Sequence, residues 1–360
     1  MNRFSLLGII IGLLVCMPAD AKSPINLCLT GKVELILPEY KLAFLNAANL
    51  AITQSSEQKN IVLKTYFYDN KPLSAIRVYD AMLRDHCSAI VGFEYLSDLL
   101  LVISQQRDTN IPIFTSYASS SDSDKLPKNI FIFVPSYNYQ AKKMMAFLHK
   151  RYGAISNALI ITEIDRADLE KYKTAYESQL KGENIHYDTF DYISNDNQFE
   201  KKLVKFVSNK RFNFVFIFSG AVGSTKIINY MNDHKVIFIG TENFGSSTNQ
   251  SLFVRLNDKK VTAYTIRNID FLKISRPLEK FVTEYTEKYN ISPSPLSAYT
   301  YDSVAIVLNT LKKHGDVNTN NVLKTDYYGI TGASISNNQF HRSNQYVLLS
   351  IGTRGFVYEK

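Results

Sequence analysis

Residues 158–193 read ALIITEIDRADLEKYKTAYESQLKGENIHYDTFDYI, and this stretch decides the fold class. It opens with an apolar run at Ala158–Thr162 that is typical of a buried strand. Apolar residues with helical spacing follow between 169 and 180, and Tyr187–Ile193 is again typical of a strand. A strand, a helix and a second strand in this order predict a βαβ unit, whose right-handed crossover makes the two strands parallel.

The same alternation continues on both sides of this unit. Further strand candidates lie at Ile25–Leu29, Ile61–Tyr68, Ala89–Val91, Ile111–Phe114, Ile130–Val134, Phe214–Phe218 and Val236–Ile239. Helical patterns lie between them, and two longer ones follow at 278–289 and 304–311, before strand-like runs at Tyr346–Ile351 and Phe356–Tyr358. The pattern predicts an α/β fold with two parallel sheets, separated near Pro135 and each covered by helices on both faces.

The composition is that of a globular protein with more than one domain. The chain has 360 residues, of which 45% are hydrophobic and 21% charged. Its 41 Lys+Arg and 33 Asp+Glu give a net charge of +8, but no basic run is longer than two residues. Nucleic-acid binding needs this charge gathered on one face, so we expect no nucleic-acid partner.

The N-terminus has the pattern of an export signal. Arg3 precedes an apolar run at Leu6–Val15, and the segment ends in Ala19-Asp20-Ala21. This arrangement predicts a signal peptide at 1–21 with cleavage after Ala21 and a periplasmic mature protein. A membrane anchor would need a longer apolar run, of roughly 20 residues. A lipid-modified Cys16 is disfavoured, because Val15 before it is larger than the small residue usual at such a site.

The sequence shows no pattern of catalytic or metal-binding residues. The six His are remote from one another, and no Gly-x-Ser-x-Gly occurs. We therefore expect no enzyme activity, no metal and no cofactor. Cys28 lies inside the strand candidate Ile25–Leu29, and Cys87 precedes the one at Ala89–Val91. An oxidising compartment would permit a bond between them, but two half-buried, unbonded cysteines are the preferred interpretation.

Several segments, taken in order, resemble the type I periplasmic solute-binding proteins of the leucine/isoleucine/valine-binding family. The matching segments are Asn46–Ala51, Tyr68-Asp69-Asn70, Ile90-Val91-Gly92, Ile111–Ser119, Phe281-x3-Tyr285-x3-Tyr289, Ala298–Ser303 and Gly329–Gly332. Any α/β protein contains such segments singly, but here they agree in order over some 300 residues. The resemblance implies two doubly wound parallel-sheet lobes, joined by a three-strand hinge and closing on a small ligand.

The resemblance also implies where the chain crosses between the lobes. Crossings near 135, 256 and 332 would assign 22–135 and 257–332 to an N-terminal lobe. Residues 136–256 and 333–360 would then form a C-terminal lobe, so both lobes are discontinuous in sequence.

Candidate ligand-binding residues lie in loops that follow strands, where open parallel sheets collect ligands. In the resembling family, positions matching Ala118 and Ser119 bind a ligand carboxylate, and the position of Glu242 holds a ligand ammonium. The alternatives without a binding role are an ordinary serine-rich surface loop at Ala118 and Ser119, and a solvated side chain at Glu242. Of the consecutive serines that the family has after the preceding strand, only Ser97 could serve here.

Three further residues are candidates for lining the cleft: Tyr95, Tyr117 and Gly220. Gly220 stands where relatives often place an aromatic residue against the ligand. The turn at Glu163–Asp168 is strongly charged where relatives often have Tyr-Gly. This turn either binds a more polar ligand or places acidic residues at a helix N-terminus, where the helix dipole favours them.

The resemblance implies a receptor that captures a small polar ligand, an amino acid or similar zwitterion, and delivers it to the membrane permease of an ABC-type importer. The alternative is a ligand-sensing or protein-partner module that uses the same fold with a repurposed cleft. Ala118, Ser119 and Glu242 favour the receptor, whereas the missing serines and Gly220 favour an unusual ligand or the alternative.

Overall fold

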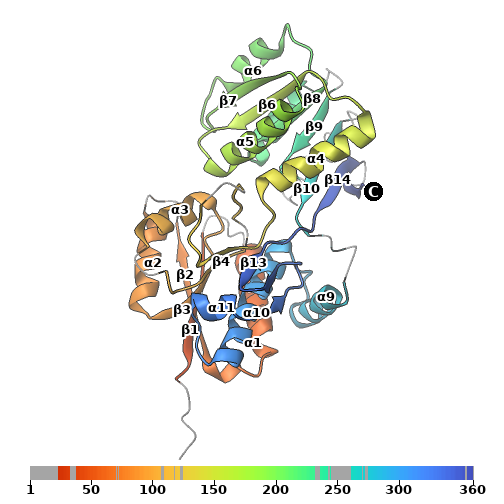
Figure 1. Cartoon of the computed structure of the whole chain (residues 1–360). Coiled ribbons are helices and arrows are strands. Elements are labelled where there is room, and N and C mark those ends of the chain that lie inside the picture. Colours follow the sequence, from red (N-terminus) through yellow and green to blue (C-terminus); the bar gives the residue numbers. More distant parts are fainter. Residues whose placement is uncertain are drawn as a thin grey trace, which may run out of the picture.

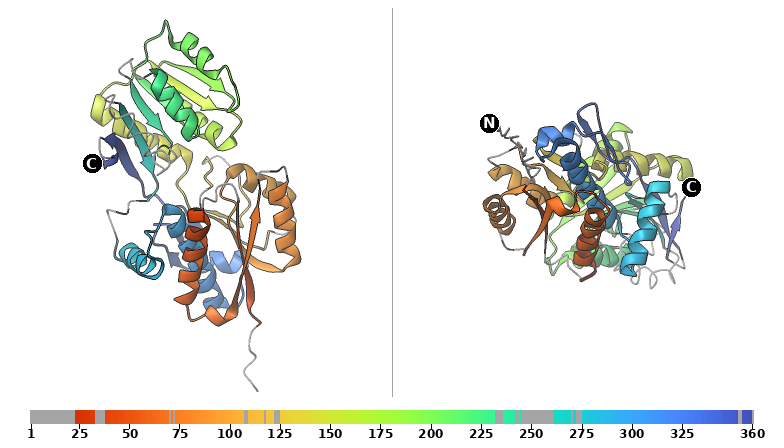
Figure 2. Two further views of the ribbon diagram at one scale, coloured as in Figure 1. Left: turned by 180° about the vertical axis from the view of Figure 1, so that it is seen from behind. Right: turned by 90° about the horizontal axis from the view of Figure 1, so that it is seen from below.

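The computed structural model describes residues 23–32, 38–69, 71, 73–106, 109–116, 118–121, 125–231, 236–241, 244, 261–269, 271, 275–352 and 355–359. These residues form two α/β lobes, one above the other, connected by several extended segments (Figure 1). The view from behind shows the same separation, with the C-terminal strands beside the upper lobe (Figure 2). The expected fold class is confirmed.

The first lobe contains a parallel five-stranded sheet in the order β2-β1-β3-β4-β5. Its strands are β1 (Ile25–Lys32), β2 (Ile61–Tyr68), β3 (Cys87–Val91), β4 (Ile113–Thr115) and β5 (Ile130–Ile132). The helical elements of this lobe are α1 (Pro38–Thr53), η2 (Gln58–Asn60), α2 (Ser74–Arg84), α3 (Leu96–Gln105), α9 (Arg276–Tyr289), α10 (Pro295–His314) and α11 (Thr319–Leu323). A small antiparallel sheet of β11 (Tyr327–Tyr328), β12 (Ser334–Ser336) and β13 (Gln339–His341) completes it.

The second lobe contains a seven-stranded sheet in the order β15-β14-β10-β9-β8-β6-β7. Its strands are β6 (Ala158–Glu163), β7 (Tyr187–Tyr192), β8 (Phe214–Phe218), β9 (Ile237–Gly240), β10 (Thr262–Arg267), β14 (Val347–Gly352) and β15 (Gly355–Tyr358). Strands β6 to β10 are parallel, and β14 and β15 add antiparallel pairs at one edge. Its helices are α4 (Tyr137–Tyr152), α5 (Ala167–Gly182), α6 (Phe199–Val207) and α7 (Ala221–Met231).

The strongest sequence signals for helices come from capping residues. Ser294 and Ser297 form a reciprocal capping box at the start of α10, with Pro295 at the first helical position. Gly315 ends α10 in the left-handed conformation (φ 82°), which costs glycine little. These signals define the two ends of α10, and the helix packs in the core of the first lobe, where Tyr299 and Val307 are fully buried.

Two of the three expected crossings lie elsewhere. The first does fall between β5 and α4, near Pro135. Residue 256 lies outside the described residues, but β10 pairs with β9, so the chain stays in the second sheet until after Arg267. The third crossing lies between β13 and β14 rather than at 332, because Ile335 belongs to the core of the first lobe.

The connecting segments are hydrogen-bonded to one another. The Ser343 amide donates to the Phe133 carbonyl at 2.9 Å, and the Ser343 hydroxyl donates to the Thr331 carbonyl at 2.6 Å. The first and third crossings are therefore joined by backbone contacts, as a hinge of adjacent extended strands requires.

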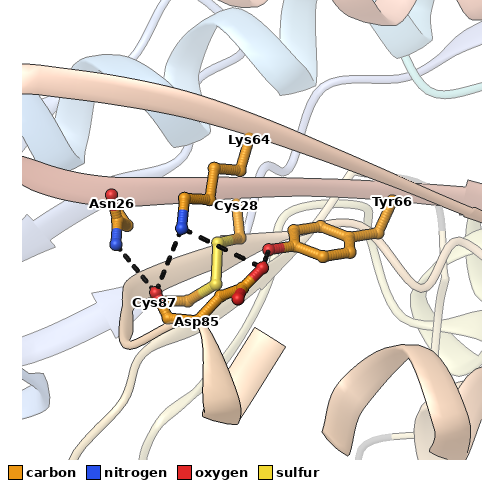
Figure 3. The surroundings of a disulfide bond; sticks show 6 residues. All are labelled: Asn26, Cys28, Lys64, Tyr66, Asp85 and Cys87. Carbon is orange, nitrogen blue, oxygen red and sulfur yellow. Dashed lines mark hydrogen bonds and ion pairs between the residues drawn. A yellow bond between two sulfur atoms is a disulfide. The ribbon is translucent and has the colours of Figure 1, made fainter. Parts of the chain in front are cut away.

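Cys28 and Cys87 form a disulfide, so the preference for two unbonded cysteines is wrong. Their Cα atoms are 5.8 Å apart on the neighbouring strands β1 and β3, a separation that suits the bond. Asp85 lies beside it and receives hydrogen bonds from Asn26 and Tyr66 (Figure 3). Both cysteines are buried, and the sequence pattern, which shows only that each lies in or before a strand candidate, does not reveal that β1 and β3 are neighbours.

Candidate functional site

Each parallel sheet has one point at which its strand order reverses. In the first lobe this point lies between β1 and β3, and in the second it lies between β6 and β8. Loops leave the sheet in opposite directions at such a point, and the crevice outside the carboxyl ends of the strands is where ligands bind in open α/β sheets. The two reversal points therefore define the candidate site.

The two lobes meet beside these points. Leu96, which begins α3 in the first lobe, is almost fully buried within the core cluster of the second lobe. Helix α3 packs against α5. Tyr95, the residue before Leu96, is half-buried and close enough to Arg166 and Asp168 of the second lobe for their charges to act on its pKa. Tyr95 therefore lies at the inter-lobe contact; its role in lining a cleft stays a prediction.

The predicted carboxylate-binding loop has its polar groups already engaged. The Ala118 amide donates to the Thr115 hydroxyl at 3.1 Å, and that hydroxyl donates to the Phe93 carbonyl at 3.3 Å. The Ser119 hydroxyl donates to the Pro135 carbonyl at 2.7 Å, and Ser119 is 5% exposed. The loop lies after β4 as expected, but a ligand would have to displace these internal bonds to use either donor.

The remaining predicted residues are scattered in their placement. Ser97 lies in the first turn of α3 and is exposed. Tyr117 and Glu242 lie outside the described residues. Gly220 lies two residues after the end of β8, and its amide donates to the Glu163 carboxylate at 2.9 Å. The structure thus brings Tyr95 and Gly220 to the two reversal points and leaves Ser97 on the surface.

At the second reversal point, the predicted residue Gly220 and the charged turn at 163–168 belong to one cluster, whose members Tyr192 and Ser219 were not predicted. We call it the Glu163 cluster; it comprises Glu163, Arg166, Tyr192, Ser219 and Gly220. The Glu163 carboxylate, at the end of β6, accepts hydrogen bonds from the Ser219 hydroxyl at 3.1 Å, from Tyr192 at 3.3 Å and from the Gly220 amide. Burial raises the pKa of Tyr192, and the Ser219 hydroxyl opposes this shift.

Arg166 is the cationic residue of the Glu163 cluster. Its Nη2 and Nε atoms bind the Asp168 carboxylate at 2.7 and 3.3 Å. Its Nη1 atom lies beside Gly220, where an added Cβ would be 3.6 Å from both Nη1 and the Glu163 carboxylate. Gly220 therefore places no side chain between these groups and the space beyond the carboxyl ends of β6 and β8.

A second cluster lies at the first reversal point, and of its members only Tyr95 was predicted. We call it the Lys32 cluster, and it comprises Lys32, Glu94, Tyr95 and Asp98. The Lys32 ammonium, at the end of β1, lies 3.4 Å from the Asp98 carboxylate and 4.8 Å from the centre of the Tyr95 ring. Tyr68, at the end of β2, donates to Asp98 at 3.0 Å. Burial, followed by the nearby charges of Glu94 and Asp98, raises the pKa of Tyr68.

Glu94 is the most unusual member of the Lys32 cluster. It is 8% exposed, and its Oε2 atom has no hydrogen-bond partner within the described part of the chain. The carboxyl lies against Gly31, where an added Cβ would be 3.2 Å from Oε1. Burial raises its pKa to about 8, its own backbone amide and Lys32 oppose the shift, and the charge of Asp98 adds to it.

Neither a metal centre nor a membrane span emerges. No group of His, Cys, Asp and Glu among the described residues could hold a metal ion. Within the same residues, none of the helices is long and apolar enough to cross a bilayer.

Solved structures share this architecture over nearly the whole chain. The leucine-binding protein LivK from Thermotoga maritima is 14% identical with a TM-score of 0.77, covering 93% of this chain and 98% of its own. LivJ from Streptococcus pneumoniae, a branched-chain amino acid transporter substrate-binding protein in complex with isoleucine, is 19% identical with a TM-score of 0.75, covering 94% and 100%. A solute-binding protein of an ABC transporter from R. palustris, in complex with benzoate, is 12% identical with a TM-score of 0.72, covering 93% and 95%.

These likenesses show that the chain has the fold of the type I periplasmic binding proteins. No protein-family model and no curated protein matches the sequence. Because the sequence identities are all low, the comparisons show the fold alone. The function has to be argued from the site.

Proposed function

We propose that the protein is an exported solute-binding receptor that captures a small polar ligand between its lobes and delivers it to an ABC-type importer. The observation that supports this most is the placement of the two polar clusters. Each lies at the reversal point of its own sheet, and the inter-lobe contact at Tyr95 brings them together. Two such crevices facing each other across a hinge form one site that excludes water when it closes.

The ligand proposed is an amino acid or a similar zwitterion. Structures with this fold contain leucine, isoleucine or benzoate, all of which carry a carboxylate. In the arrangement taken from the family, the loop at Ala118 and Ser119 binds the carboxylate, and Glu242 binds the ammonium. The Ser119 hydroxyl gives up its bond to Pro135 in doing so, so its net contribution is small.

Export to the periplasm and a non-catalytic role belong to the same proposal. The disulfide between Cys28 and Cys87 supports export, since such bonds form and persist in oxidising compartments. The membrane partner would be the permease of the importer, which would recognise the two lobes in their closed arrangement.

One observation favours a second candidate function, a sensing or protein-partner module. Leu96 of the first lobe is buried in the core cluster of the second lobe, so the two lobes are packed against each other at this point. This packing suits a protein whose lobes stay together and present an outer surface to a partner.

A melting-temperature screen distinguishes the two functions. The mature protein is heated alone and with each of a set of amino acids, amides, amines, short peptides and carboxylic acids. A receptor is expected to gain about 2.7 kcal/mol at a ligand concentration 100 times Kd, which raises its melting temperature by several degrees. If every compound leaves the melting temperature unchanged at millimolar concentration, the partner-module function gains and the receptor is contradicted.

A further inference from the structure

The Lys32 cluster already holds an ammonium group in the way that a ligand's ammonium would be held. The Lys32 ammonium lies over the ring of Tyr95 and beside the Asp98 carboxylate, both of which are favourable contacts for an organic cation. The side chains of Lys32 and Asp98 are only 17% and 12% exposed, so water screens this pair weakly. The cluster therefore combines an aromatic face and a carboxylate at the reversal point of the first sheet.

Glu94 adds an acceptor that the chain itself does not use. Its Oε2 atom is buried without a hydrogen-bond partner in the described residues, which is costly unless something else binds there. Two carboxyl groups, those of Glu94 and Asp98, thus face one lysine. An arriving ammonium would find an acceptor that Lys32 leaves unpaired.

The two clusters together carry more carboxyl groups than cations. Around the inter-lobe contact, the carboxyl groups of Asp98, Glu163 and Asp168 face two cations, Lys32 and Arg166, and burial keeps the Glu94 carboxyl largely protonated below pH 8. The whole chain, by contrast, carries a net charge of +8. An acidic site in a basic protein attracts cations locally and does so without help from the rest of the surface.

We propose that the first lobe binds the ligand's ammonium group through Glu94, Asp98 and the ring of Tyr95, at the position that the Lys32 ammonium now occupies. The ligand is accordingly a primary organic amine, free or as part of an amino acid. This inference rests on the proposed function and deepens it. It places the ammonium in the first lobe, whereas the family arrangement places it in the second, on Glu242.

The wild-type protein is tested first with three probes that share one carbon skeleton. L-leucine carries an ammonium and a carboxylate, isopentylamine only the ammonium, and 4-methylpentanoate only the carboxylate. Calorimetric titration is expected to show binding of isopentylamine at least about tenfold tighter than that of 4-methylpentanoate, with L-leucine also bound. Equal or tighter binding of 4-methylpentanoate overturns the proposal.

Matched variants then locate the ammonium. Asp98→Asn keeps the shape of the side chain and removes its charge, so it should weaken amine binding at least about tenfold. Asp85→Asn is the matched control, because it removes the same charge beside the disulfide. Asp85 lies before β3, at the opposite end of the first sheet, so this variant should bind the amine within about twofold of the wild type. If both variants bind amines alike, the ammonium does not lie in the Lys32 cluster and the proposal fails.

A chemical-rescue experiment tests the cluster itself. Lys32→Ala removes three carbons and the ammonium, which n-propylamine replaces atom for atom. This amine should raise the melting temperature of the variant, and 1-propanol, its neutral counterpart, should not. Absence of rescue overturns the proposal.

A further outcome would also overturn the proposal: n-propylamine rescues Lys32→Ala, but the wild type binds no cation. In that case Lys32 occupies the cluster permanently and leaves no place for a ligand. A wild type that binds only uncharged or anionic solutes would contradict this inference and leave the receptor function standing. The two failures are therefore distinguishable.

Discussion

Replacement of Asp302 by alanine is expected to lower the free energy of unfolding by about 3–5 kcal/mol. Asp302 lies in α10 and is fully buried. Its carboxylate accepts hydrogen bonds from Tyr327 at 2.7 Å, from the amides of Ile330 and Thr331 at 2.9 Å each, and from the Thr331 hydroxyl at 2.5 Å. Alanine leaves all four donors without an acceptor in the core, and an unsatisfied buried donor costs more than the bond contributes.

The Asp302 carboxylate also explains why residue 329, just before Ile330 and Thr331, is a glycine. A Cβ on Gly329 would lie 2.3 Å from the Asp302 carboxylate, so only glycine permits the approach. Chemical denaturation of the wild type and of Asp302→Ala measures the loss. Asp316→Ala is the matched control, because Asp316 also accepts from two side-chain amides but is exposed, and its loss should stay under about 1 kcal/mol. Similar losses in the two variants would contradict this account of Asp302.

The second large effect is a pH dependence from Glu94. Its pKa is about 8 in the folded protein against an ordinary value of 4.5. Between these values the folded state holds one proton more than the unfolded state, so stability falls as the pH rises, by roughly 1.4 kcal/mol per pH unit. The charged and titratable groups that face Glu94 are Lys32, Tyr68, Tyr95 and Asp98.

Glu94→Gln removes this proton linkage and leaves the shape of the side chain. Relative to the wild type, the variant should therefore become progressively more stable from pH 5 to pH 8, and the two should converge near pH 4.5. Denaturant unfolding of both proteins at several pH values gives the difference directly. A difference that stays constant across this range would show that Glu94 does not bind a proton more tightly in the folded state.

Most of the architecture was predictable because its strands are short, buried apolar runs. The runs at Ala158–Thr162 and Phe214–Phe218 appear as β6 and β8 in the expected parallel arrangement. Strand β10 was missed because Thr262–Arg267 mixes polar and apolar residues, although it pairs between β9 and β14. The hairpin β12–β13 turns through Asn337 and Asn338, both at positive φ, a turn signal that was present in the sequence.

The sequence indicated where the candidate site lies in the fold, but not the hydrogen bonds within it. The rule that ligands collect after parallel strands singled out Tyr95 and Gly220, which the structure places at the two reversal points; a binding role for them stays a prediction. It could not show that Thr115 and Pro135 already bind the polar groups of Ala118 and Ser119, because those bonds depend on how separate loops meet. Nor could it single out Glu94, which lies in the loop after β3 and is buried against Gly31 of the neighbouring strand β1.

The central claim is that a small solute binds between the lobes, and calorimetry on Gly220→Leu tests it most directly. A Cβ at Gly220 meets only ordinary contacts at 3.6 Å, so the variant should fold, but the larger side chain projects into the room beside Arg166. We expect the compound that raises the melting temperature of the wild type to bind the variant at least about 100-fold more weakly. The melting temperature of the ligand-free variant should stay close to that of the wild type. Unchanged affinity in a folded Gly220→Leu protein would contradict the account.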